Sequence, residues 1–118
     1  MISGLGTDII EIERIRKAVA KKIFRDDVFT EHEQAYCESR EKNSAASYAA
    51  RFAAKEAFFK ALGTGIILPL TDVEIINDKR GAPKINLRGK VAALVESENI
   101  LLSLSHSKDF ATAVCIIK

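Results

Sequence analysis

The segment from Ser44 to Leu62 constrains the fold more than any other part of the sequence. It is rich in alanine, it contains no glycine or proline, and Phe52, Phe59 and Leu62 recur at helical spacing. Gly63 follows at once, at the position where many helices end in a glycine. We therefore predict one long helix over residues 44–62.

Before and after this segment, the spacing of apolar residues predicts strands, in which every second residue lies on the same face. From Met1 to Ile12, one face of a strand would carry Ile2, Gly4, Gly6, Asp8, Ile10 and Ile12. A hairpin is predicted from strands near 73–76 and 83–87, and two apolar strands near 100–106 and 110–117 end the chain. Strands and helices do not alternate regularly. The predicted fold is therefore α+β, a single domain (1–118) with a mainly antiparallel sheet packed against the long helix.

Three shorter helices complete the prediction. One covers about residues 13–24, where Ile15, Ala18, Val19 and Ile23 form an apolar stripe with cations opposite. Another begins at Thr30, where Glu33 three residues later is the pattern of a capping box. The third covers about residues 90–98.

Charge is nearly balanced, but it is unevenly distributed. The 118 residues carry a formal net charge of +2, which does not favour binding to nucleic acid. Six cations and no acid lie between Arg14 and Arg25. Such a run is either a solvated helix face or a docking surface for an acidic partner.

Length, cysteine usage and hydropathy bound the setting of the protein. A chain this short buries a modest core, so oligomerisation would help it. The two cysteines, Cys37 and Cys115, form no CxxC pair, which is typical of a reducing compartment. No targeting segment and no apolar stretch near the length of a membrane span is evident, so we expect a soluble, cytoplasmic protein without membrane contact.

Two carboxylates stand out as candidate metal ligands. Asp8 shares its strand face with isoleucines, where a bare charge is costly to bury. The alternative is a carboxylate at a frayed strand end. Glu56 lies among aromatic residues and near three cations, Arg51, Lys55 and Lys60, although an ordinary Glu56–Lys60 surface pair is also possible. Magnesium binds one or two carboxylates and completes its shell with phosphate oxygens and water.

Other candidates are less informative from the residues alone. His106 at a strand end is more often structural than catalytic, and a helix cap and turn suffice to explain Gly63-Thr64-Gly65. The sequence contains no zinc-ligand spacing, no GxSxG motif and no GxxxxGK[ST] phosphate loop.

Three segments together resemble the holo-acyl-carrier-protein synthase family of phosphopantetheinyl transferases. They are Gly4-Leu5-Gly6-Thr7-Asp8-Ile9 with Glu13-Arg14-Ile15, the stretch from Arg51 to Ile66 with its FxxKEAxxK pattern, and Leu102 to Ser107. The likeness covers nearly the whole chain. One departure is Gly81-Ala82-Pro83-Lys84, where the family often has glycine-lysine-proline.

The resemblance implies a magnesium-dependent enzyme of fatty acid and lipid biosynthesis. It would move 4′-phosphopantetheine from coenzyme A to a serine of apo-acyl carrier protein and release 3′,5′-ADP. Asp8, Glu56 and Lys60 would be the catalytic residues, with Mg²⁺ held by the first two and either Glu56 or a metal-held water as base.

The resemblance also implies binding roles and an assembly. Arg51, Lys60, Gly63, Gly65 and His106 would contact coenzyme A. Arg14 would dock the carrier, and the protein would be a homotrimer with each site between two subunits. Three alternatives remain: a non-catalytic coenzyme A or nucleotide-binding module, a purely structural trimer, and a transferase for secondary-metabolite carriers.

Overall fold

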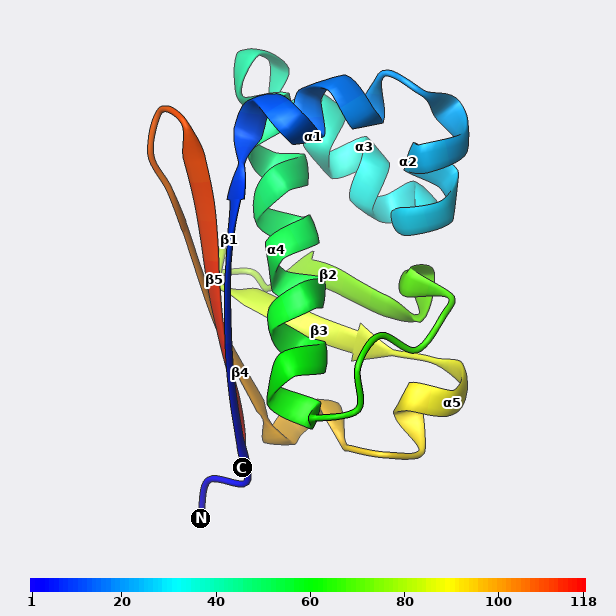
Figure 1. Ribbon diagram of the computed structural model, residues 1–118, viewed down its shortest axis with the longest axis vertical. Helices are drawn as coiled ribbons and strands as arrows, with labels where there is room; N and C mark the ends of the chain where they lie inside the picture. Colours follow the sequence, from blue (N-terminus) through cyan, green and yellow to red (C-terminus); the bar gives the residue numbers. More distant parts are fainter.

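Helix α4 (Ser44–Leu62) is the element around which the other elements pack in the computed structural model, which describes residues 1–118 (Figure 1). It has the predicted bounds, and Gly63 ends it in the left-handed conformation at φ 80°. Most of its side chains are buried, because strands cover it on two sides. Alanine at many of these positions lets the strands approach the helix closely.

A three-stranded antiparallel sheet lies against one side of α4. Its order is β1 (Gly4–Glu11), β5 (Phe110–Ile117), β4 (Ile100–His106), so the last strand in sequence lies in the middle. A separate hairpin, β2 (Val73–Asn77) with β3 (Pro83–Leu87), packs against another side of the helix (Figure 1). The α+β class with antiparallel strands on a long helix is therefore confirmed, with the strands divided between two sheets.

The predicted helix over 13–24 is wrong as a single element. The structure has α1 (Ile12–Val19) and α2 (Lys22–Val28), separated by an extended residue at Lys21. Ile12 begins α1 and does not continue the strand. Ile15 is buried as predicted, but Ile23 is 78% exposed because the break turns it toward solvent.

Helix α3 (Glu31–Ser39) begins as predicted. Thr30 Oγ1 accepts a hydrogen bond from the backbone N–H of Glu33, and Glu33 Oε1 accepts one from the backbone N–H of Thr30. Both halves of the capping box are present.

The predicted helix over 90–98 is mostly irregular. Only α5 (Gly89–Ala92) is α-helical, and a short 3₁₀ turn (Ser97–Asn99) leads into β4. Elsewhere, Glu41–Asn43 and Leu70–Asp72 form 3₁₀ turns. None of the helices has the length and apolar character that crossing a bilayer requires.

Candidate active site

Two glycines bring strand β1 into direct contact with α4. A Cβ placed at Gly6 would lie 2.0 Å from the backbone oxygen of Ala57, and one at Gly4 would lie 2.1 Å from that of Ala61. Any larger residue would force the strand away from the helix. Asp8 follows on the same face of β1, so this close approach sets where its carboxylate meets α4.

Asp8, Glu56 and Lys60 come together at this contact. The Asp8 side chain is 15% exposed, and its Oδ1 lies 3.1 Å from Lys60 Nζ. Burial raises the pKa of Glu56, and the charge of Asp8 raises it further, while Lys60 and Arg14 oppose the rise. The two predicted metal ligands are therefore close enough for their charges to interact, with two cations beside them.

The structure differs from the two simplest alternatives for these residues, although it contains an ion pair between Asp8 and a cation, as the purely structural alternative expects. Asp8 lies within β1, paired with Ala113 of β5, and is not at a frayed end. Lys60 forms its ion pair with Asp8 on another element, where an ordinary surface pair would have joined it to Glu56.

The donor set fits a hard cation that keeps part of its shell for other ligands. The chain has no group of three or more acidic, histidine or cysteine side chains that could hold a metal, so a complete protein cage is not formed. Two carboxylates that repel each other are the arrangement that Mg²⁺ would stabilise, since it binds one or two carboxylates and takes water or phosphate oxygens for the rest.

Arg51 and His106 form a second cluster. Both line a hollow of about 200 Å³, together with Tyr36, Arg40 and the turn at Gly81 and Pro83, and no carboxylate lines it. This agrees with a shared role in binding an anion. Tyr36 and Arg40 were not predicted as part of it, because their approach to Arg51 depends on how α3 packs on α4.

A single chain keeps the two clusters apart. Asp8 lies on β1 and His106 on β4, the opposite edges of the sheet with β5 between them. Arg51 and Glu56 are five positions apart on α4, which places them about 140° apart around the helix axis. One copy of the chain therefore does not assemble all the predicted coenzyme A residues into one pocket.

Gly63 and Gly65 lie in the exposed loop that follows α4. Both have positive φ, 80° and 73°, which explains why glycine is present at each. The loop begins three residues after Lys60. The predicted contact of these glycines with coenzyme A stays a prediction.

The interpretation of Lys55 as a cation beside Glu56 is wrong. Lys55 is 1% exposed, and its Nζ donates to Glu33 Oε1 at 2.9 Å and to the backbone oxygens of Val28 and Leu70 at 2.6 and 3.1 Å. All three of its hydrogens are thus used inside the core. Lys55 holds α3 and the Leu70 turn to α4, on a different side of the helix from Glu56.

The cationic run between Arg14 and Arg25 is partly neutralised. Arg16 pairs with Glu13, Lys22 pairs with Asp26, and Arg25 donates to the backbone oxygen of Val19. The remaining cations, which are exposed, are Arg14, Lys17 and Lys21. They form a smaller positive surface on α1 and the break before α2.

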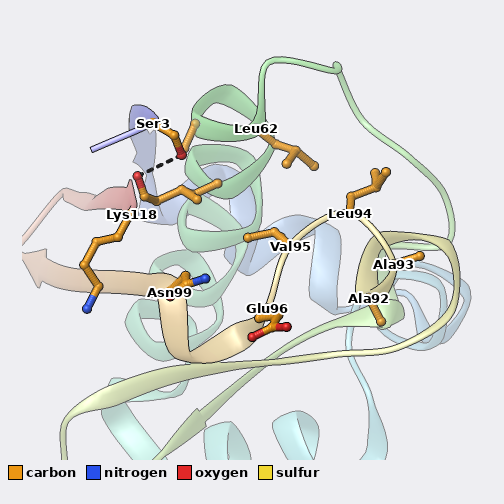
Figure 2. Close-up of a pocket in the computed structure, with 11 residues that line it drawn as sticks. Ser3, Leu62, Ala92, Ala93, Leu94, Val95, Glu96, Asn99 and Lys118 are labelled. Atoms are coloured by element: carbon orange, nitrogen blue, oxygen red, sulfur yellow. Dashed lines mark hydrogen bonds between the residues drawn. The ribbon is translucent and has the colours of Figure 1, made fainter. Parts of the chain in front are cut away.

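Another hollow contains none of the predicted site residues. It has a volume of about 740 Å³ and lies between the end of α4 and the segment after α5, where Leu62 and Leu94 approach each other (Figure 2). Its position beside the chain ends separates it from the chemistry described above.

Comparison with known proteins shows which family the chain resembles over nearly its whole length. Residues 4–115 match the family described as the 4′-phosphopantetheinyl transferase superfamily. The chain is 43% identical to a holo-[acyl-carrier-protein] synthase of Fusobacterium nucleatum over 99% of each chain. It is 49% identical to one of Chlamydia muridarum, over 96% of this chain and 92% of the relative. A holo-(acyl-carrier-protein) synthase of Bacillus anthracis in complex with CoA (3′,5′-ADP) superimposes with a TM-score of 0.82 and 37% identity, over 99% of this chain and 96% of that one.

Proposed function

The chain belongs to the 4′-phosphopantetheinyl transferase superfamily, and from this premise we propose that it is a holo-acyl-carrier-protein synthase. It transfers the 4′-phosphopantetheine arm of coenzyme A to a serine of apo-acyl carrier protein. The observation that carries the proposal is the convergence of Asp8, Glu56 and Lys60 from two elements that Gly4 and Gly6 hold in contact. The names of the relatives at 43–49% identity support the same substrates.

Asp8 and Glu56 are the residues that would hold Mg²⁺. When bound, the ion would withdraw charge from the coenzyme A diphosphate and stabilise the departing 3′,5′-ADP. Lys60, already beside Asp8, neutralises charge on the same diphosphate. We place the reaction in the cytoplasm and in fatty acid and lipid synthesis.

The serine oxygen of the carrier forms the new bond to phosphorus while the bond from phosphorus to the 3′,5′-ADP oxygen breaks. The serine proton must be accepted by a nearby base. Without a metal, burial and the charge of Asp8 raise the pKa of Glu56, but a cation held by the two carboxylates would oppose this shift. The base is therefore either Glu56 or a metal-held water.

Conservative substitution of each carboxylate tests this site. We expect Asp8→Asn and Glu56→Gln each to lower transfer by about 100-fold or more, since each removes a charge that acts on the reacting diphosphate. The measurement is the mass of the apo carrier, which gains one phosphopantetheine on transfer. Asp109→Asn, at an exposed position in the β4–β5 turn, is the matched control and should retain activity.

The same variants test the metal. Calorimetry should show that Mg²⁺ strengthens coenzyme A binding to the unmodified protein and that this gain is lost in both variants. Unchanged binding with excess chelator would contradict the metal assignment. Coenzyme A binding without any mass change of the carrier would favour the non-catalytic alternative.

The positive surface of Arg14, Lys17 and Lys21 is proposed to dock the acidic carrier. Lys21→Glu should raise the KM for carrier several-fold, in a salt-dependent manner, and leave coenzyme A binding unchanged. Arg14→Glu should raise the same KM and should also weaken coenzyme A binding, to a smaller extent, because Arg14 influences the pKa of Glu56. Lys118→Glu, with the same charge change at the chain end, is the control; equal effects of Lys118→Glu and Lys21→Glu would contradict a specific docking surface.

We propose that the chain forms a homotrimer through the outer face of its three-stranded sheet. Exposed apolar residues cover this face, which α4 leaves open: Leu5 (63% exposed), Ile9 (64%), Leu101 (47%), Phe110 (44%) and Val114 (38%). Leu5 and Leu101 both lie opposite Ile116 in the strand register, so they form a continuous apolar row. Contiguous apolar patches of this kind favour contact with another protein surface. A second copy would also bring its own Arg51 and His106 to the Asp8 and Glu56 of the first copy.

A further inference from the structure

Arg51 is a buried cation without a buried anion. Its side chain is 3% exposed, and it forms no ion pair within the chain; its one hydrogen bond runs to a neutral amide. Its Nε is buried and has no hydrogen-bond partner. Buried charges are normally paired, because an isolated one is costly, so this guanidinium is prepared for an anion that the chain itself does not provide.

Two side chains hold this guanidinium in place. The ring of Tyr36 lies against it, with its centroid 4.1 Å from Cζ, and Asn77 Oδ1 accepts a hydrogen bond from Nη2 at 2.6 Å. Asn77 is itself fixed, because its Nδ2 donates to the backbone oxygen of Gly81 at 3.1 Å. Tyr36 thus sets the plane of the guanidinium, and Asn77 sets its rotation within that plane.

The surroundings of Arg51 suit a compact, doubly charged anion. Arg40 lies over the same Tyr36 ring at 5.8 Å, and Arg40 and His106 line the same hollow as Arg51. Coenzyme A carries two anionic groups, the diphosphate and the 3′-phosphomonoester. The diphosphate is proposed to bind at Asp8, Glu56 and Lys60, which leaves the phosphomonoester for this cluster.

We infer that Tyr36 and Asn77 are positioning residues that act through Arg51 and set the preference of the enzyme for the 3′-phosphate of coenzyme A. The inference rests on the proposed function, because it concerns the same donor substrate. Neither residue needs to touch the reacting atoms. Removal of either leaves Arg51 in the wall of the hollow with its orientation no longer fixed, so the bond to phosphate weakens while the chemistry at the diphosphate is spared.

The test compares coenzyme A with 3′-dephospho-coenzyme A as donor. Asn77→Ala and Tyr36→Leu should each reduce the preference for coenzyme A, measured as the ratio of kcat/KM values, by about 10-fold, the range for one hydrogen bond to a charged group. The loss should appear in the KM for coenzyme A, with kcat and the kcat/KM for the dephospho donor nearly unchanged. Tyr36→Phe retains the ring that covers Arg51 and should retain the preference.

A further variant keeps the test decisive if the alanine variant does not fold. In Asn77→Asp, the aspartate has the same shape as asparagine and should form an ion pair with Arg51, in competition with the phosphate. This variant should therefore lower the preference for coenzyme A at least as much as Asn77→Ala. Equal losses with both donors would show a merely structural role and overturn the inference, as would a Tyr36→Phe variant no better than Tyr36→Leu. An unmodified protein that uses both donors equally well would refute this inference alone, whereas no transfer from either donor would refute the proposed function.

Discussion

Lys55 and Glu56 are neighbours in the sequence, yet they lie on different sides of α4. Successive residues of a helix are about 100° apart, so Lys55 faces Glu33 in the core while Glu56 faces Asp8. Burial lowers the pKa of Lys55, and the charge of Glu33 opposes that shift. The same short motif therefore contributes one residue to the interior and one to the candidate site.

Substitution of Lys55 should destabilise the protein without touching the site directly. In Lys55→Met, the carboxylate of Glu33 loses its cation in the core, which should cost about 3–5 kcal/mol of unfolding free energy. The double variant Lys55→Met/Glu33→Gln removes that unpaired charge, so it should be more stable than Lys55→Met alone. Urea unfolding of the parent, of Lys55→Met and of the double variant measures the free energy of unfolding of each protein.

Lys42→Met, at an exposed position, is the control for loss of a lysine charge and should change the unfolding free energy little. A Lys55→Met protein as stable as the parent would show that the buried pair contributes nothing. A double variant less stable than the single one would show that the bond from Ile75 N–H to Glu33 matters more than the charge.

Asp8, Glu56, Lys60 and Arg14 could be named from the sequence because their residue types conflict with their predicted surroundings or match a family motif. Tyr36, Arg40 and Asn77 carry no such signal. Asn77 contributes through a contact with Arg51, which is 26 residues away in the chain. Tyr36 and Arg40 contribute through the packing of α3 on α4. Lys55 was misjudged for the same reason, since only the packing of α3 reveals Glu33 as its partner.

At the scale of elements, the contact between β1 and α4 decides the geometry of the site. Gly4 and Gly6 face the backbone of the helix at Ala61 and Ala57, and Asp8 is the next residue on that face. The glycines therefore act on the site through the distance between two elements.

Gly6→Ala should impair activity more than its cost in stability suggests. Its Cβ would lie 2.0 Å from Ala57 O and 2.6 Å from Ala61 N, which are backbone atoms that cannot rotate away. The strand must shift, at a cost of about 1–3 kcal/mol, and this shift moves Asp8 relative to Glu56. We expect a folded protein whose transfer rate falls by about 10-fold or more, because small misplacements of catalytic groups are costly.

Glu98→Ala, at an exposed position outside both the site and the outer face of the sheet, is the control and should change stability and transfer little. Thermal unfolding and the carrier mass assay are measured on both proteins. A Gly6→Ala variant with normal activity and reduced stability would separate the packing of β1 from the function of Asp8.

Element boundaries were predictable where a local signal exists. Gly63 ends α4 and the Thr30–Glu33 box begins α3, and both signals are present in the sequence. The break between α1 and α2 falls at Ala20 and Lys21, residues that favour helix, so nothing local announces it. Tertiary packing determines that boundary, and it also exposes Ile23.

At the scale of the whole molecule, the α+β class was predictable from the order of elements, whereas the separation of the site into two clusters was not. That separation follows from the strand order, in which β5 lies between β1 and β4. An apolar outer face on the same sheet supports the proposal that neighbouring copies join the clusters. The arrangement leads to a test that distinguishes a shared site from a site within one chain.

Mixed assemblies should recover transfer that neither parent shows when the concentration of coenzyme A is far below the KM of the Arg51→Ala variant. Glu56→Gln lacks the proposed metal ligand but retains Arg51, and Arg51→Ala has the opposite defect, so a shared site that takes Glu56 from one copy and Arg51 from the next is intact in some mixed trimers. With random assembly of equal amounts, about one quarter of the sites combine both intact residues, since each ring interface joins two different surfaces. Co-expression with two affinity tags isolates the mixed species. The control is a mixture of Glu56→Gln and Asp8→Asn, which should recover no activity because both variants damage the same cluster. If each chain supplied all of its own site residues, the Glu56→Gln and Arg51→Ala mixture would stay as inactive as its parents, and the shared site would have to be abandoned even if size measurements showed a trimer.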